Sequence, residues 1–386
     1  MTALAVFHTF VLGVLAALAV QTLLNVRTMR RLSTSSSPAT WPRVSVLIPA
    51  RNEADGIEAC IAAWRSQQCP DYELVIFDDD SSDGTGLRIA NATAGATNIR
   101  VIEGGRLPSG WRGKTHACHR LREHARGDVL VFADVDVTPA PSALASALAA
   151  FQAAGGQALS ALPSHAPLPP LLRAIVGLQH WAAVTVAPVW LSSVGRHRTL
   201  AMLNGQFVVI SAAVYDAAGG FSAVRGSLAE DTAFGRRLVG LGYRVAFVDG
   251  TRVLRCHAYA RLADVWHANV RNLASVLFGS PRLLLGSAVI LTLVYVVPPL
   301  LVGVGAILGH AGTLAWTWLP AVEIGLAIAT RAVVDHRAGH SVWLAAFHPL
   351  AVAWLVGMHA DALARSRRRG DIEWRGRRYR VTDEVA

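Results

Sequence analysis

Long apolar runs at both ends of the chain constrain its fold more than any other feature. No charged residue occurs in residues 1–26, and residues 283–308 and 314–330 together contain only one, Glu323. A helix of about 20 consecutive apolar residues is long enough to cross the hydrocarbon core of a bilayer. The sequence therefore predicts a transmembrane anchor over residues 1–26 and a membrane region over residues 283–363.

The positions of basic residues predict how these helices are oriented across the membrane. Arg27, Arg30 and Arg31 follow the first apolar run, whereas a secretory signal peptide carries its positive charges before the run. Since basic clusters favour the cytoplasmic side, we expect a multi-pass protein of the bacterial inner membrane whose central domain is cytoplasmic. The net charge of +10 fits contact with anionic lipid headgroups. Basic residues interleaved with aromatic ones are missing from the centre, which argues against nucleic acid as a partner.

The central region, residues 43–264, has the pattern of an α/β domain with a mostly parallel sheet, joined to the anchor by a linker at residues 27–42. The expected elements are a helix over 53–65 and buried strands over 44–48, 73–77, 101–102 and 128–132, the first of them ended by Pro49. Ligands of such sheets gather at the carboxyl ends of the strands. The four scattered cysteines form no CxxC pair, which is typical of reduced thiols in a cytoplasmic protein.

Two further stretches lie between the strands and the membrane. Residues 168–191 are apolar but carry Arg173 and His180. They form either an interfacial helix lying at the headgroups or a core helix of the central domain, and the pattern alone leaves both open. Residues 265–282 are expected to form an amphipathic connecting helix.

Acidic clusters follow two of the expected strands. Asp78 and Asp79 come directly after the second strand, where carboxylates can bind a ribose or a base N–H, or can cap the next helix. Asp134 and Asp136 follow the fourth strand, and side chains two apart on a strand point the same way. Oxygen ligands of this kind suit Mg²⁺ or Mn²⁺, ions that also bind substrate phosphates.

Two smaller motifs add a cation and a second carboxylate pair. Lys114 stands beside Gly113 in a loop between strands and suits a phosphate, although the spacing is not that of a P-loop. Glu230 and Asp231 precede an amphipathic stretch, where a carboxylate can act as a general base or simply complement the helix dipole. His116 and His119 are interpreted as packing residues of a helix rather than metal ligands.

The order in which these motifs occur is more specific than any single motif. The succession resembles family 2 glycosyltransferases with the GT-A fold. Three stretches, residues 204–207, 219–231 and 374–379, are similar to bacterial carotenoid and hopanoid-associated lipid glycosyltransferases. The full succession is Pro49-Ala50-Arg51-Asn52-Glu53, the Asp78 cluster, Gly113-Lys114, Asp134-Val135-Asp136, Gly219-Gly220-Phe221 and Glu230-Asp231.

The resemblance implies roles on the donor side of a nucleotide-sugar site. Pro49, Arg51 and Glu53 would border the nucleotide. Asp79, or Asp78, would bind the base and ribose. The donor is expected to be a UDP- or GDP-sugar.

The resemblance also implies how the reaction proceeds. Gly113 and Lys114 would bind the donor phosphates, and Asp134 would face the nucleotide sugar. Asp136, with Asp134, would hold Mg²⁺ or Mn²⁺. Asp231, supported by Glu230, would be the general base of an inverting displacement.

The acceptor side departs from the wider family, because the RxxRW motif of processive and ceramide-type relatives is missing. Trp266 and Arg271 are the candidates that could substitute for it. The expected reaction moves a single sugar to a membrane lipid of carotenoid, hopanoid, polyprenyl or glycerolipid type. A processive polysaccharide synthase, a non-catalytic scaffold with the same fold and a transporter are the alternatives, although few ionisable groups lie in the apolar segments.

The last apolar segment, residues 342–358, conflicts with the basic tail at 364–386. A full crossing would place Arg365 and the cluster at 375–380 outside, against the positive-inside rule, and Pro349 would interrupt the helix at mid-length. We therefore expect a re-entrant or interfacial segment. The tail would return to the catalytic domain, with Trp374-Arg375-Gly376-Arg377 near the donor phosphates or the lipid surface.

Overall fold

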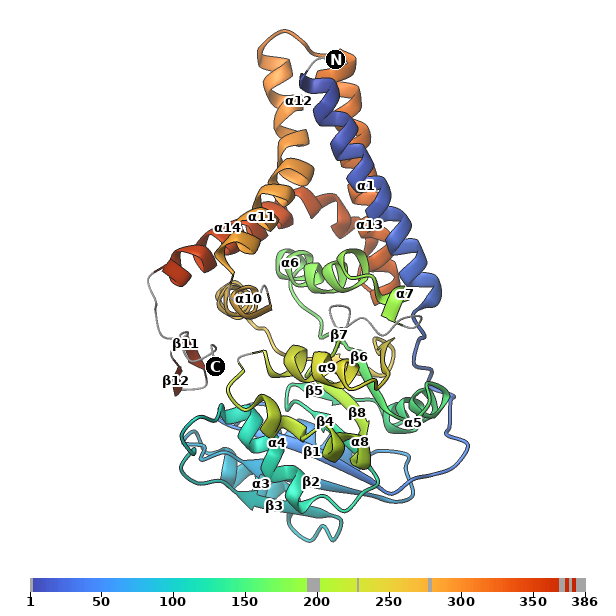
Figure 1. The fold of residues 1–386 in the computed structure, drawn as a ribbon, viewed down its shortest axis with the longest axis vertical. Coiled ribbons are helices and arrows are strands. Elements are labelled where there is room, and N and C mark those ends of the chain that lie inside the picture. The colour runs from blue at the N-terminus through green and yellow to red at the C-terminus, as the bar shows by residue number, and fades with distance from the viewer. Residues whose placement is uncertain are drawn as a thin grey trace. The chain divides into compact units, whose positions relative to one another are not determined.

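The computed structural model describes residues 3–192, 202–227, 229–276, 280–367, 372–374 and 377–379. The chain divides into a helical unit and a unit that carries the main β-sheet (Figure 1). The helical unit comprises Met1–Thr28, Pro167–Pro188 and Tyr259–Ile372. The sheet unit comprises Met29–Ala166, Val189–Ala258 and Glu373–Ala386.

The sheet unit is built on seven strands in the order β3-β2-β1-β4-β8-β6-β9. Neighbouring strands are parallel except where β8 pairs with β4 and with β6, so the prediction of a mostly parallel sheet is confirmed. The strands are β1 (Val44–Ala50), β2 (Tyr72–Asp78), β3 (Ile99–Glu103), β4 (Val129–Ala133), β6 (Ala158–Leu162), β8 (Phe207–Ser211) and β9 (Val245–Asp249).

Helices cover this sheet and smaller strands extend the unit. The helices are α2 (Ile57–Arg65), α3 (Thr85–Thr93), α4 (Gly113–His124), α5 (Ala143–Ala153), α7 (Val189–Ser192), α8 (Ala212–Ala217), the 3₁₀ turn η3 (Gly220–Val224) and α9 (Glu230–Gly240). A second sheet has the order β5-β10-β7, with β5 (Val137–Pro139), β7 (Ser164–His165) and β10 (Leu254–Cys256). A two-stranded sheet near the C-terminus pairs β11 (Ile372–Trp374) with β12 (Arg377–Tyr379).

The central strands read as continuous apolar runs because both faces of the sheet are covered. Val44, Val46 and Ile48 of β1 lie in the core layer that includes residues of α2 and α5, whereas Leu47 lies in the layer that includes residues of α4 and α9. This alternation is the period of two that a strand imposes on its side chains. Burial on both faces is typical of parallel sheets.

The chain order of the strands creates a crevice at one edge. After β3 the chain returns to the other side of β1 and forms β4, so ligand-binding loops are expected where β1 and β4 diverge. Ala50 pairs with Asp78, so the loops after β1 and β2 leave the same edge. Because β8 is antiparallel to β4 and Phe207 pairs with Ala133, the residues just before β8 also reach this edge.

Two predicted boundaries differ from the structure. Strand β1 does not end at Pro49 but continues to Ala50, because a proline removes only one N–H from the ladder and Pro49 stays in register with Phe77. The helix expected from Glu53 begins at Ile57, because the intervening residues form a turn in which the Glu53 carbonyl accepts from the Gly56 and Ile57 N–H groups.

Four helices in the described part of the chain are long and apolar enough to cross a membrane: Ala3–Thr28, Pro281–Ile307, Leu314–Ala338 and Val342–Arg365. The helical unit consists of α1 (Ala3–Thr28), α6 (Pro170–Trp181), η1 (Ala182–Val186), α10 (Leu262–Val276), α11 (Pro281–Leu291), η4 (Thr292–Val296), α12 (Val297–Ile307), η5 (Leu314–Trp318), α13 (Leu319–Ala338), η6 (Val342–Phe347) and α14 (His348–Arg367).

The last of these segments is longer than the sequence predicted. Pro349 is the second residue of α14 rather than a mid-length interruption, and a proline is accommodated in the first turn because its N–H is not needed there. The segment does change at this point, from the 3₁₀ helix η6 to α14, but the predicted loss of a mid-helix hydrogen bond is wrong. The basic tail lies partly outside the described residues, among them Arg368, Arg369 and Arg375.

Buried charged groups inside the helical unit are paired. His8 Nδ1 lies 2.9 Å from Glu323 Oε1, and Arg331 Nε lies 2.8 Å from Asp335 Oδ1. Arg331 also donates to the carbonyl oxygen of Ala174 in α6, 3.0 Å away. Helix α6, from the stretch for which the sequence left two interpretations open, therefore packs within the helical unit. Its position relative to a lipid surface stays a prediction.

Candidate active site

The loops after β1 and β2 are tied together at the crevice edge. The Asn52 N–H donates to Ser81 Oγ (3.0 Å), and the Ser82 N–H donates to Asn52 Oδ1 (2.9 Å). Asn52 has φ 51°, in the left-handed region that asparagine tolerates better than most residues. Arg51 donates to the carbonyl oxygens of Asp79 and Asp80, the latter at 3.0 Å. The two loops thus form one rigid rim.

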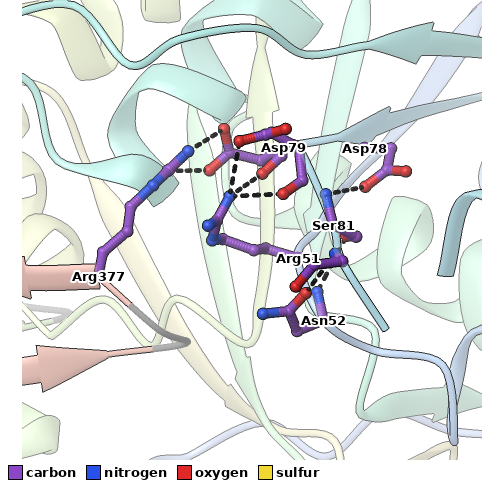
Figure 2. Close-up of polar contacts among 8 residues, drawn as sticks. Arg51, Asn52, Asp78, Asp79, Ser81 and Arg377 are labelled. Carbon is purple, nitrogen blue, oxygen red and sulfur yellow. Dashed lines mark hydrogen bonds and ion pairs between the residues drawn. The ribbon is translucent and has the colours of Figure 1, made fainter. Parts of the chain in front are cut away.

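The two aspartates that the sequence treated as alternatives differ in their contacts. Asp78 Oδ1 accepts the Ser81 N–H (3.2 Å) and so holds the loop. Asp79 is buried, and Figure 2 shows its carboxylate facing Arg377 rather than its own loop. Arg377 donates to both carboxylate oxygens, with Nη2 3.1 Å from Oδ1. Burial raises the pKa of Asp79, although the guanidinium groups of Arg377 and Arg51 oppose the shift.

Lys114 joins two acidic motifs that are far apart in the sequence. Its Nζ lies 2.7 Å from Asp134 Oδ1 and 3.5 Å from Glu230 Oε1. Gly113 and Lys114 are the first residues of α4 rather than loop residues, so Lys114 is placed by a helix start. Burial alone would lower the pKa of Lys114, but the two carboxylates outweigh it and raise the pKa above the ordinary lysine value. Lys114 is therefore a fixed positive charge.

The carboxyl groups of Glu230 and Asp231 have different surroundings. Both residues begin α9. Asp231 accepts the N–H of Gly205 on Oδ2 (3.0 Å) and that of Thr232 on Oδ1 (2.6 Å). Burial raises the pKa of Glu230 to about 7, against the opposing charge of Lys114 and with a further contribution from Asp231. Glu230 therefore takes up a proton near neutral pH.

Gly205 lies between the lysine and the proposed base. A Cβ atom built on it would lie 3.3 Å from Lys114 Nζ and 3.2 Å from Asp231 Cβ. The next residue, Gln206, accepts the Asp134 N–H on its carbonyl oxygen (3.2 Å). A side chain at position 205 would thus crowd the cluster of Lys114, Asp134, Glu230 and Asp231.

Asp134 and Asp136 lie in the turn between β4 and β5, not on a strand, so the argument from strand alternation does not apply to them. The turn is closed by the Val137 N–H donating to the Asp134 carbonyl oxygen (3.1 Å). Both aspartates still approach the same buried thiols: burial chiefly raises the pKa of Cys60 and Cys256, and both carboxylates add to the rise. These thiols stay neutral, and all four cysteines are free.

Aromatic and imidazole rings pack against one another near Asp79. The His116 ring centroid lies 6.0 Å from that of Phe77 and 5.5 Å from that of Trp111, which also stacks on His119 at 5.0 Å. In the described residues no group of three or more His, Cys, Asp or Glu side chains could hold a metal ion. The histidines pack against aromatic rings.

The structure thus brings Lys114, Asp134, Glu230 and Asp231 together, with Pro49 at the same sheet edge. Trp266 and Arg271 belong to the helical unit, on α10. The Trp266 Nε1–H donates to Asp361 Oδ2 at 2.8 Å. Their acceptor-side role stays a prediction.

Sequence reasoning assigned no role to Gly205 and placed Arg377 by the phosphates or the lipid. It also missed one compositional signal. Lys114 is the only lysine among the 36 lysines and arginines of the chain. A chain that uses arginine everywhere else keeps lysine at the one place where a compact ammonium meets two carboxylates.

The carboxylate-lined edge of a mixed sheet, with the Lys114 ammonium held between two of its carboxylates, is typical of a glycosyltransferase of the GT-A class. A family model described as glycosyltransferase like family 2 matches residues 42–276, and the chain belongs to this family.

Known proteins extend the likeness beyond the sheet unit. Two curated relatives from Staphylococcus aureus strains, each called 4,4'-diaponeurosporenoate glycosyltransferase, are 23% identical over 364 and 351 residues. The first match covers 92% of both chains, and the second covers 88% of this chain and 89% of the relative. A solved mannosyltransferase from Pyrobaculum calidifontis, in complex with GDP-Man and Mn²⁺, is similar in fold with a TM-score of 0.53. It is 18% identical, and the match covers 94% of this chain and 98% of that one.

Proposed function

We propose that this enzyme transfers one sugar from a nucleoside-diphosphate sugar to a membrane lipid, with inversion at the anomeric carbon. One observation carries the proposal: the Lys114 ammonium bridges Asp134 and Glu230 beside Asp231, at the edge where a donor would lie. A fixed cation there suits a leaving diphosphate, and an adjacent carboxylate suits proton removal from an acceptor.

On the donor side, the rim formed by the loops after β1 and β2 would hold the nucleoside. Asp79 would accept hydrogen bonds from the base or ribose, with Pro49, Arg51 and Glu53 bordering the nucleotide. Lys114, at the start of α4, would bind the diphosphate together with the Gly113 backbone, because the N-terminus of a helix favours anions.

The chemical step balances with the residues of the cluster. The acceptor oxygen forms a bond to the anomeric carbon while the bond from that carbon to the diphosphate oxygen breaks. The nucleoside diphosphate leaves with its electron pair, and the acceptor hydroxyl proton passes to Asp231. The N–H groups of Gly205 and Thr232 fix the Asp231 carboxylate, so that it does not need to reorient during the reaction.

The carboxylate ligands of the cluster suit a divalent cation that is also bound by the substrate. Mg²⁺ and Mn²⁺ need only one or two carboxylates when phosphates and waters complete the shell, and Asp136 and Asp134 supply two. Because Lys114 contacts both oxygens of Asp134, at 2.7 and 2.9 Å, Asp136 would be the principal ligand. The cation would supply Lewis-acid stabilisation of the diphosphate charge.

For the acceptor we propose a carotenoid-type lipid, on the strength of the curated relatives' name. Such a lipid would reach the enzyme from the bilayer, consistent with the four candidate spans. The sheet unit would lie in the cytoplasm, because Arg27 stands in the last turn of α1 and Arg30 and Arg31 follow that helix. A hydroxyl acceptor would need Asp231 as its base, whereas a carboxylate acceptor would already be ionised.

The experiment is a screen of UDP- and GDP-sugars with purified protein and extracted bacterial lipids, with products read by mass. A single mass increment of one sugar, of inverted configuration by NMR coupling, is the expected result. A ladder of sugars would identify a processive synthase instead. Retention of the configuration at the anomeric carbon would rule out a single direct displacement as the mechanism.

A further inference from the structure

The C-terminal tail delivers a cation to the carboxylate that the donor would use. Arg377, the first residue of β12, donates from Nη1 and Nη2 to the two oxygens of Asp79, 298 residues away in the chain (Figure 2). Only 14% of the Arg377 side chain and 3% of the Asp79 side chain are exposed. A two-pronged pair between largely buried groups holds its geometry better than a single-point ion pair at the surface.

This pair engages both carboxylate oxygens of Asp79. A carboxylate only accepts hydrogen bonds, and the guanidinium engages and covers both of its oxygens. The rest of Asp79 is fixed by the sheet edge: its N–H donates to the Ala50 carbonyl oxygen at 2.8 Å, and its own carbonyl oxygen accepts from Arg51. A ligand that approaches Asp79 from the side of Arg377 must therefore compete with the guanidinium for the same two oxygens.

The surroundings of the pair suit a flat heterocycle. Phe77 and Trp111 contact the His116 ring, and the charge of Asp79 acts on that imidazole. His116 Nδ1 is buried and has no hydrogen-bond partner among the described residues. Burial chiefly lowers the pKa of His116, so the ring is neutral at pH 7. Aromatic rings with an unpartnered ring nitrogen beside a carboxylate can hold a nucleobase.

We propose that Arg377 is a latch: its guanidinium occupies Asp79 in the donor-free enzyme, and the nucleoside of the donor displaces it on binding. The proposal rests on the proposed function in taking a nucleoside diphosphate as the ligand and Asp79 as the carboxylate that binds its base or ribose. The base or ribose supplies hydrogen-bond donors in place of those of Arg377, so binding and release of the tail are one event. The enzyme thus couples occupation of its donor site to the position of its C-terminal strands.

The latch makes a prediction opposite to that of an ordinary binding residue. The measured Kd of a ligand equals its intrinsic Kd divided by the fraction of molecules able to bind, so a latch closed in about 70–90% of molecules weakens binding by about three- to tenfold. In the purified full-length protein, Arg377→Ala should therefore tighten binding of UDP or GDP, whichever binds the wild type, by that factor. Arg377→Lys keeps the charge but not the two-pronged guanidinium, so its Kd should lie between those of the wild type and Arg377→Ala.

Isothermal titration calorimetry of UDP and GDP gives the Kd, and Arg378→Ala is the matched control because it removes the same charge one residue away. The Kd of the control should equal that of the wild type. Unchanged nucleotide binding by Arg377→Ala overturns the latch. Weaker binding overturns it as well, because Arg377 would then be part of the nucleotide site. Binding of neither nucleotide to either protein overturns it as well.

Tail release gives a second readout that does not depend on affinity. With an epitope tag at the C-terminus, trypsin should remove the tag faster when nucleotide is added to the wild type. Arg377→Ala should lose the tag rapidly with or without nucleotide. Slower loss on adding nucleotide would mean that the tail closes over the ligand, and the latch would be wrong. Neither readout needs sugar transfer, so failure of the lipid screen and failure of the latch are separate results.

Discussion

Lys114 Nζ lies within 3.5 Å of carboxylate oxygens of both Asp134 and Glu230, although these residues come from three separate motifs. The first residues of α4, the turn after β4 and the start of α9 meet at this ammonium. Since Lys114 is the chain's single lysine, its chemistry can be probed without interference from other side-chain amines.

Lys114→Arg should therefore be inactive although it keeps the charge. The planar guanidinium does not reproduce the compact ammonium, whose Nζ lies 2.7 Å from Asp134 Oδ1 and 3.5 Å from Glu230 Oε1. We expect turnover to fall by about 10²–10³-fold, the loss typical of removing one group that stabilises transition-state charge. Steady-state kinetics measures this. Turnover of Lys114→Arg near that of the wild type would contradict the assignment.

Asp231→Asn should lower turnover by roughly 10²–10⁴-fold with a hydroxyl acceptor, since a general base is worth that much. Donor affinity should change little, because Asp231 acts on the acceptor. Asp71→Asn, an exposed aspartate at the opposite end of β2, is the control. Full activity of Asp231→Asn with a hydroxyl acceptor would move the role of base to Glu230. Full activity with a carboxylate acceptor alone would fit an acceptor that needs no base.

Asp136→Asn should abolish turnover while leaving the melting temperature within a few degrees of the wild-type value. EDTA should inhibit the wild-type enzyme, and Mn²⁺ or Mg²⁺ should restore it. Direct binding of Mn²⁺ in the presence of UDP or GDP, followed by electron paramagnetic resonance, supplies a readout besides activity. Unimpaired turnover in EDTA would remove the metal from the reaction.

The buried Glu230 gives the enzyme a pH dependence near neutrality. Its pKa is about 7 in the folded chain against 4.5 as the ordinary value, so the folded state retains the proton longer and loses stability as the pH rises between these values. The wild-type melting temperature should fall over this window relative to that of Glu230→Gln. Turnover should rise through pH 7, because an ionised Glu230 favours proton transfer to Asp231. An identical pH profile of the variant would contradict this.

The side of the membrane on which the tail lies can be tested by labelling. In a Cys69→Ser background, in which the three remaining cysteines are buried, a cysteine introduced near Arg380 should resist a membrane-impermeant maleimide in intact cells and react after lysis. A cysteine placed in the loop between α12 and η5, at His310, should react from outside and serves as the control. Ready external labelling near Arg380 would show that residues 342–365 cross the membrane.

The strand runs could be predicted from the sequence because both faces of the sheet are buried, which leaves continuous apolar stretches such as β1 and β4. The order of the acidic motifs was equally informative, since each follows a strand. The convergence of Gly205 on Lys114 was not predictable, because it depends on β8 running antiparallel to β4. Local periodicity does not reveal the direction in which a neighbouring strand runs.

The contact of Arg377 with Asp79 lay beyond the sequence for a different reason. The two residues are 298 positions apart, and no pattern in either segment specifies the other. The sequence predicted a basic tail on the cytoplasmic side that returns to the catalytic domain, near the donor phosphates or the lipid surface, but it did not predict Asp79 as the partner of Arg377. The error over Pro349 has the same origin as the error over Pro49: each proline was interpreted without knowing its position within its element, which decides what the missing N–H costs.

The ion pair between Arg377 and Asp79 also constrains how many times the chain between them can cross the membrane. Two residues in contact lie on the same side of a membrane, so the chain that joins them must cross it an even number of times. Within the described residues, three candidate spans separate them: Pro281–Ile307, Leu314–Ala338 and Val342–Arg365. Three is odd, so we infer that at least one of these candidate helices does not complete a crossing. The last, which opens with a 3₁₀ turn and leads into the basic tail, is the one that we infer turns back.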